Sequence, residues 1–185
     1  MFFDFAEENA TVLLPRWRHL KWSTAAGPEW QAFGFTSQHA NELRELEEMH
    51  VARAADAAVP LFRVTVPDLR LQQLLDPATP EVRPLTSADE LVIEENLVVL
   101  HNRRTAATDG RRAGAIAFGL TYFAAEVLSR ASYKQIQSAC RKGARLAEFA
   151  PRCGYLRNAG RNFQLTQQQR TALAITSSTL MRSIL

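Results

Sequence analysis

The stretch TYFAAEVLSRASYKQIQSACRKGARLAEF, residues 121–149, decides the fold, because it holds two helical patterns joined by a short turn. The first helix has an apolar stripe formed by Phe123, Val127 and Leu128, and Ala131 follows as a turn. Ser132 is of the residue types that cap a helix, and the pattern predicts a second helix after it. The predicted inward positions of this second helix are Tyr133, Ile136, Cys140 and Gly143 or Ala144.

The outward positions of the second helix carry side chains that suit DNA. Gln can form two bonds to an adenine edge, Ser is adaptable, and Lys or Arg can meet guanine edges or phosphates. A helix after a short turn can also enter the major groove by its first turns. Polar and basic residues are equally what any solvated helix face shows, so both interpretations stay open. The candidate DNA-binding residues are Lys134, Gln135, Gln137, Ser138, Arg141, Lys142, Arg145, Arg111 and Arg112.

The bulk composition indicates a folded chain with a core of its own. It has 185 residues, 46% of them hydrophobic, which suits one domain or two small ones. Apolar runs are too short for a membrane span, and the start MFFDFAEENA lacks the basic region of a secretory signal. We expect a cytoplasmic protein that does not enter a membrane.

Charge divides the sequence into an acidic and a basic half. Residues 1–95 contain 16 Asp or Glu and 8 Lys or Arg, whereas residues 96–185 contain 3 and 14. Such asymmetry favours a polyanion partner for the basic half, because Lys and Arg near phosphates release condensed counterions. Alternatively, the acidic half folds back on the basic half and neutralises it.

The remaining patterns predict a mainly α protein, a helical bundle with a helix-turn-helix-like element in the C-terminal half and possible short strands in the N-terminal part. We expect irregular or short-strand structure over the aromatic-rich first 35 residues, a helix over about 36–58, and a short strand within 59–66. A short helix over 68–75 precedes the Pro-rich segment 76–84, the best candidate for a linker. The predicted domains are therefore an acidic region, 1–85, and a basic all-α domain, 86–185.

Helix boundaries in the basic half rest on caps and glycines. A capping box of Ser87 and Glu90 begins a strongly apolar helix that runs to about Thr105. Asp109 can cap a helix that ends at Gly119, and a last helix begins at Thr166.

Sequence patterns of catalysis and metal binding are missing. No Gly-rich phosphate loop, HExxH motif or nucleophile elbow occurs, and the four histidines lie in separate segments. Cys140 and Cys153 form no CxxC pair, so we interpret them as ordinary thiols, with an intersubunit disulfide or redox role as the alternative. We expect no enzyme, no metal, no cofactor and no small-molecule substrate.

Residues 96–149 resemble FlhD, the flagellar master-regulator subunit, over some fifty positions without a gap. NLVVLHNRRTAATDGRRAGAIAFG is similar to the family's stretch in which a leading Asn-Leu begins a long helix, an Asp marks the turn, and a small-residue helix closes on a Gly. The following stretch resembles the family at Leu128, Ser132, Gln135, Ile136 and Phe149. Asp109 sits one position early, and the first 95 residues have no counterpart.

This resemblance implies an all-α protein that forms a homodimer and assembles with a FlhC-like subunit into a DNA-binding transcriptional activator. In that family the partner subunit carries the zinc site. Our hypothesis is therefore a transcriptional regulator subunit that binds promoter DNA. The alternative is a helical adaptor or chaperone-like protein of a secretion or conjugation system, whose basic half binds an acidic protein surface.

Overall fold

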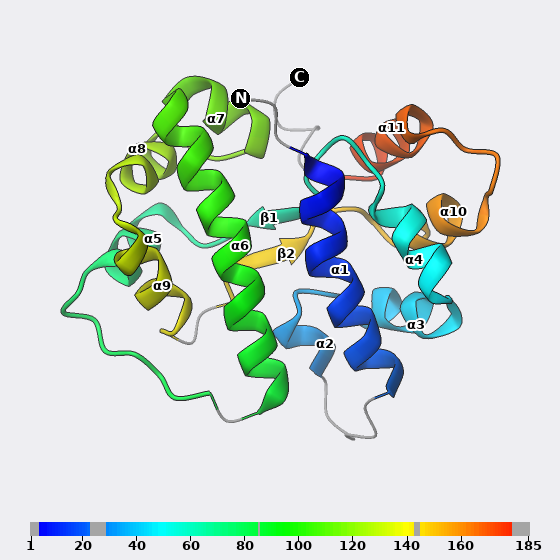
Figure 1. Ribbon diagram of the computed structural model, residues 1–185, viewed down its shortest axis with the longest axis horizontal. Helices are drawn as coiled ribbons and strands as arrows, with labels where there is room; N and C mark the ends of the chain where they lie inside the picture. Colours follow the sequence, from blue (N-terminus) through cyan, green and yellow to red (C-terminus); the bar gives the residue numbers. More distant parts are fainter. Residues whose placement is uncertain (1–3, 23–28, 85, 143–144, 179–185) are drawn as a thin grey trace. The chain divides into compact units, whose positions relative to one another are not determined.

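Helices make up most of the protein. The computed structural model describes residues 4–22, 29–84, 86–142 and 145–178. Two short strands, β1 (Phe62–Val64) and β2 (Ala147–Phe149), pair with each other within this part of the chain (Figure 1). The prediction of a mainly α fold with short strands is confirmed, although the strand expected within 59–66 covers only three residues.

Contacts divide the chain into two compact units. Residues 63–148 form one, which we call the inserted unit, and residues 2–62 with 149–185 form the other, the flanking unit. This division differs from the boundary expected near residue 85. The Pro-rich segment 76–84 joins two helices of the same unit, so it is a connection within the inserted unit.

The charge asymmetry of the sequence does not coincide with these units. The inserted unit contains 12 Lys or Arg and 10 Asp or Glu, because it takes residues from both the acidic and the basic half. Bulk charge therefore gives little reason to expect a polyanion partner, and only the positions of individual Lys and Arg side chains can favour one.

The flanking unit contains α1 (Phe5–Trp22), α2 (Glu29–Ala32), α3 (Ser37–Glu45), α4 (Glu48–Ala55), α10 (Tyr155–Arg161) and α11 (Gln167–Ser177). The expectation of irregular or strand structure near the start is wrong for α1. Its buried residues recur at helical spacing despite Pro15 inside the helix. These residues are Glu8, Asn9, Val12, Leu13, Arg16, Trp17 and Leu20.

The helix expected over 36–58 is two helices, α3 and α4. Leu46 adopts an extended conformation at the end of α3, which interrupts the helical hydrogen bonds. The indole Nε1 of Trp17 donates to the carbonyl of Leu43, at 3.0 Å, which also accepts from the Leu46 amide, and to the carbonyl of Leu46, at 3.2 Å. A tertiary contact thus stabilises a break that local periodicity does not reveal.

Asn9 of α1 ties down the segment that follows α4. Its amide nitrogen lies within 3.2 Å of the carbonyls of Ala55, Ala57 and Val59, and its oxygen accepts from the Leu61 amide at 2.8 Å. The side chain is fully buried, so each of its hydrogen-bonding groups needs such a partner.

An aromatic cluster forms part of the flanking unit's core. Phe35, Phe62 and Phe149 pack edge to face, with ring centroids 5.4–6.2 Å apart. The His39 ring lies 5.2 Å from Phe149 and is buried. Its Nδ1 accepts from the Thr36 amide at 3.3 Å, while Thr36 Oγ1 accepts from the His39 amide, which closes a capping box on α3.

The inserted unit is organised around the long helix α6 (Ser87–Asp109), shown in green in Figure 1. Helices α5 (Asp68–Leu75), α8 (Tyr122–Arg130) and α9 (Tyr133–Cys140) surround a common apolar core with it. The predicted helices of this region are confirmed, but the capping box of α6 uses Thr86 and Asp89 where Ser87 and Glu90 were expected. Asp109 is the last residue of α6, and Gly110 is the N-cap of the next helix.

Helix α7 (Arg111–Phe118) packs closely on the C-terminal part of α6. The Arg103 guanidinium lies 4.4 Å from the Phe118 ring centroid, and Gly114 approaches the Ala106 backbone so closely that an added Cβ would lie 2.8 Å from it. Gly119 then ends α7 with φ of 62°, in the left-handed region that favours glycine.

Replacing Gly114 by Ala should therefore destabilise the protein by about 1–3 kcal/mol, because the new methyl group forces two helix backbones apart. The matched control is Gly110→Ala, whose Cβ would meet only the Ala113 side chain, at 3.8 Å. Urea unfolding of both variants measures the difference, and equal midpoints would contradict the close contact of α6 and α7.

Burial lowers the pKa of His39 below its ordinary value, outweighing the opposing effect of the Glu42 carboxylate. Because the folded-state pKa lies below the unfolded one, its contribution to stability is complete above about pH 6.5 and is lost as the pH falls through the folded pKa. Protonation would also remove the acceptor for the Thr36 amide.

The variant His39→Gln keeps a side-chain acceptor for the cap but does not titrate. Wild type should lose more free energy of unfolding than this variant between pH 7 and pH 5, as measured by urea unfolding at each pH. Parallel pH profiles would contradict the assignment.

Candidate nucleic-acid interface

Two capped helices, α8 and α9, form the helix-turn-helix-like element. Thr121 Oγ1 accepts from the Ala124 amide at 2.9 Å and donates to the Asp68 carboxylate at 2.8 Å, which joins the start of α8 to α5. Ala131 and Ser132 connect the helices, and Ser132 forms a capping box with Gln135. The expected cap at Ser132 is confirmed.

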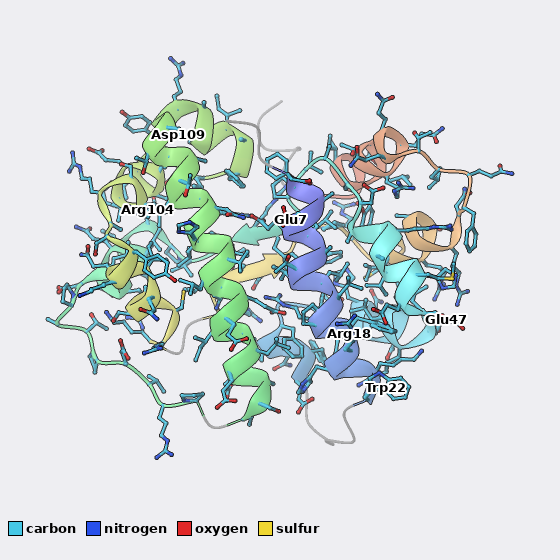
Figure 2. The ribbon with its side chains drawn as sticks, viewed as in Figure 1. Glu7, Arg18, Trp22, Glu47, Arg104 and Asp109 are labelled. Carbon is cyan, nitrogen blue, oxygen red and sulfur yellow. The ribbon has the colours of Figure 1, made fainter. Side chains whose placement is uncertain are left out.

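Helix α6 fixes the connection between the two helices. The Nε of Arg104, labelled in Figure 2, donates to the Ala131 carbonyl at 2.5 Å. One turn earlier on α6, the His101 ring packs edge to face against Tyr133, with centroids 5.8 Å apart. Both contacts hold the beginning of α9 against α6.

The residues on one side of α9 belong to the hydrophobic core of the inserted unit. Ile136, Ala139 and Cys140 are buried with leucines of α5, α6 and α8. Burial raises the pKa of the Cys140 thiol to about 12, so at neutral pH it is an unreactive apolar group. Ile136 and Cys140 thus lie inward as expected, whereas Gly143 and Ala144 lie outside the described residues.

The opposite side of α9 presents a continuous polar face. We call its five residues the α9 face: Tyr133, Lys134, Gln137, Ser138 and Arg141. Their spacings of one, three and four place them on one side of a helix. Lys134 and Arg141 are exposed, and Gln137 and Ser138 are half-buried. The expectation that Tyr133 points inward is wrong, since 49% of its surface is exposed.

Two predicted DNA-contact residues, Lys142 and Gln135, instead donate hydrogen bonds to carbonyls at the C-terminal end of α5. The Lys142 Nζ donates to the carbonyls of Leu74 and Asp76 at 2.7 Å each, and only 5% of this residue is exposed. The Gln135 amide donates to the Leu75 carbonyl at 3.3 Å, while its oxygen accepts from Ser132. The outward placement expected for Lys142 is therefore wrong, because carbonyls at a helix end need donors.

Of the predicted arginines, only Arg141 belongs to the α9 face. Arg145 pairs with Glu148 at 2.7 Å, and Arg141 lies 4.0 Å from Glu81, with both its side chain and that of Glu81 about half exposed. Arg112 is exposed on α7, a separate helix that packs against α6 at Ala106. The side chain of Arg111 is outside the described set.

A shallow groove of about 640 Å³ runs between α5 and α8. Leu69 and Phe123 stand on its rim with 71% and 41% of their surfaces exposed, and Val127 and Ala131 also line it. The apolar stripe predicted for α8 is thus only partly internal, because Phe123 faces this groove.

We found neither a metal site nor a membrane-spanning helix in residues 4–22, 29–84, 86–142 and 145–178. No cluster of His, Cys, Asp or Glu in these ranges could hold a metal ion. None of the helices described there has the length and apolar character to cross a membrane. Cys153 is exposed and lies in the flanking unit, where its Sγ donates to Gln38 at 2.8 Å.

Comparison with known proteins gives no family assignment. No family model matches the sequence, and no curated protein or solved structure is significantly similar to it.

The different roles of two lysines near α9 can be separated by unfolding measurements. Lys142→Met keeps the apolar stem but removes the ammonium, so it should cost about 1–3 kcal/mol by leaving α5 carbonyls without their donor. Lys134→Met, the matched control on the exposed face, should change stability by less than about 0.5 kcal/mol. Equal losses of unfolding free energy in the two variants would contradict the structural role of Lys142 and the free, exposed position of Lys134.

Proposed function

We propose that this protein is a DNA-binding transcriptional regulator subunit, with the α9 face as its contact surface. The observation that carries the proposal is a row of polar residues, the exposed Lys134 and Arg141 and the half-buried Gln137 and Ser138, at the second of two helices joined by a two-residue turn. In helix-turn-helix proteins the second helix lies in the major groove and its first turns contact base edges.

Each side chain of this row has a distinct chemical role in the proposed complex. Lys134, in the first turn, forms no hydrogen bond or ion pair within the described part of the chain, so it can bind a guanine edge or a phosphate. Gln137 has the amide that pairs with adenine, and Ser138 can bond either base type. Arg141 follows the last turn, where a phosphate can replace its weak, solvent-exposed partner Glu81.

The resemblance of residues 96–149 to FlhD supports a more specific form of the proposal. In this form the protein is a cytoplasmic activator subunit that forms a homodimer and acts on promoter DNA with a FlhC-like partner. The resembling stretch runs from Asn96, within α6, through α9, and therefore includes the α9 face and the part of α6 that positions it. Gln135 and Ser132 of that resemblance form the capping box that begins α9.

A second candidate function is favoured by the groove between α5 and α8. Leu69 and Phe123 are large apolar side chains exposed at its rim, which is typical of surfaces that bind another protein. This supports the helical adaptor or chaperone-like alternative.

DNA binding can be tested with the full-length protein and random-sequence duplex DNA at several salt concentrations. The double variant Lys134→Gln/Arg141→Gln should lower affinity about tenfold or more at low salt and reduce the slope of log K against log salt by up to about 2. The matched control, Arg44→Gln, removes an exposed cation of the flanking unit and should change neither.

An unchanged salt slope in the double variant would contradict the contact assignment. Wild-type protein that binds no duplex at low salt would contradict DNA binding itself. If such a protein bound a helical partner peptide in a manner abolished by Leu69→Ser/Phe123→Ser, the adaptor function would take its place.

A further inference from the structure

Tyr133 is the unexpected member of the α9 face. It is the first residue of α9, about half of its surface is exposed, and it stands beside Lys134 at the end of the helix that the proposed complex inserts first. The other members of the face, Lys134, Gln137, Ser138 and Arg141, have no aromatic ring. The tyrosine ring is therefore the large apolar group of this surface.

The orientation of the ring is restricted by α6. The His101 ring meets Tyr133 at an interplanar angle of 82°, an edge-to-face arrangement that aromatic pairs prefer. Arg104, three residues later on the same helix, binds the Ala131 carbonyl two residues before Tyr133. One turn of α6 thus fixes both the backbone that leads into α9 and the first side chain of α9.

We propose that Tyr133 is a specificity-determining residue that packs its ring against the methyl group of a thymine, and that His101 is the residue that positions it. The inference rests on the proposed DNA-binding function. The thymine C5-methyl is the apolar group that the major groove offers, and a rigid apolar ring is its natural complement. Lys134, Gln137 and Ser138 supply the polar contacts to neighbouring base pairs.

A purely structural role makes a different prediction. If Tyr133 only shields α6 beside His101, its loss lowers stability without changing which base is preferred at any position. Base preference therefore separates the two roles, and a probe that alters the DNA alone needs no variant protein.

The experiment begins with selection of preferred duplexes from a random library by the full-length wild-type protein. We expect one position of the selected site to require thymine, and replacing that thymine by deoxyuridine, which lacks the methyl group, should weaken wild-type binding about fivefold. Tyr133→Ala should bind the two duplexes equally, whereas Tyr133→Phe should keep the preference. Trp22→Ala, which removes an exposed aromatic of the flanking unit, is the matched control and should behave as wild type.

His101→Ala tests positioning. It should reduce the thymine preference at the same position and leave the preferences at other positions unchanged, and its effect should not add to that of Tyr133→Ala. A loss of affinity that is equal for all sequences would show that His101 has no positioning role.

The outcomes distinguish this inference from the function on which it rests. Wild type that binds no duplex overturns both. Wild type that selects a site but is insensitive to the thymine methyl at every position, or a Tyr133→Ala variant that keeps the methyl sensitivity, overturns the role of Tyr133 and leaves DNA binding intact.

Discussion

Two side chains in and just after α9 donate hydrogen bonds to the carbonyls at the end of α5. These bonds determine which way the other polar residues of α9 face. Gln135 and Lys142 donate to the last carbonyls of α5, so the half-buried Gln135 and the buried Lys142 are both held in contacts within the inserted unit. A lysine ammonium is costly to bury, and the paired carbonyls offset that cost. Once these contacts are fixed, helical geometry leaves one direction for the remaining polar residues. The α9 face is therefore a consequence of how α5 ends.

Helix α6 supplies the second constraint on the same element. Its Leu100 contributes to the core beneath α9, its Arg104 holds the connection to α8, and its His101 meets Tyr133. These three residues span little more than one helical turn of α6. Between them they contact the buried side of α9, the backbone just before it and its exposed first residue. Such rigid support suits the DNA contact proposed for this face, because sites built on packed helices are more precise than sites on loops.

Sequence patterns predicted the elements with strong local signals. Ser132, Gly119 and Thr166 mark helix boundaries by their own chemistry, and each does so in the structure. Features that depend on distant residues were not predictable in this way. The break between α3 and α4 depends on Trp17, and the burial of Lys142 depends on carbonyls some seventy residues earlier. For the candidate site, the α8–α9 pair and Lys134 were predictable, whereas the exposure of Tyr133 follows from where α6 lies beside α9.

The division of the chain has a consequence for its synthesis on the ribosome. The inserted unit is continuous, and its ends meet where the Thr65 amide donates to the Leu146 carbonyl at 3.1 Å. The flanking unit is built from both ends of the chain, and Tyr155, for example, donates to the carbonyl of Ala54. Since translation proceeds from the N-terminus, α1 to α4 are made first, but their contacts with α10 cannot form until α10 has been made. The inserted unit is made before α10 and can complete its own contacts earlier. The segment made in the middle is thus the first able to reach its final structure.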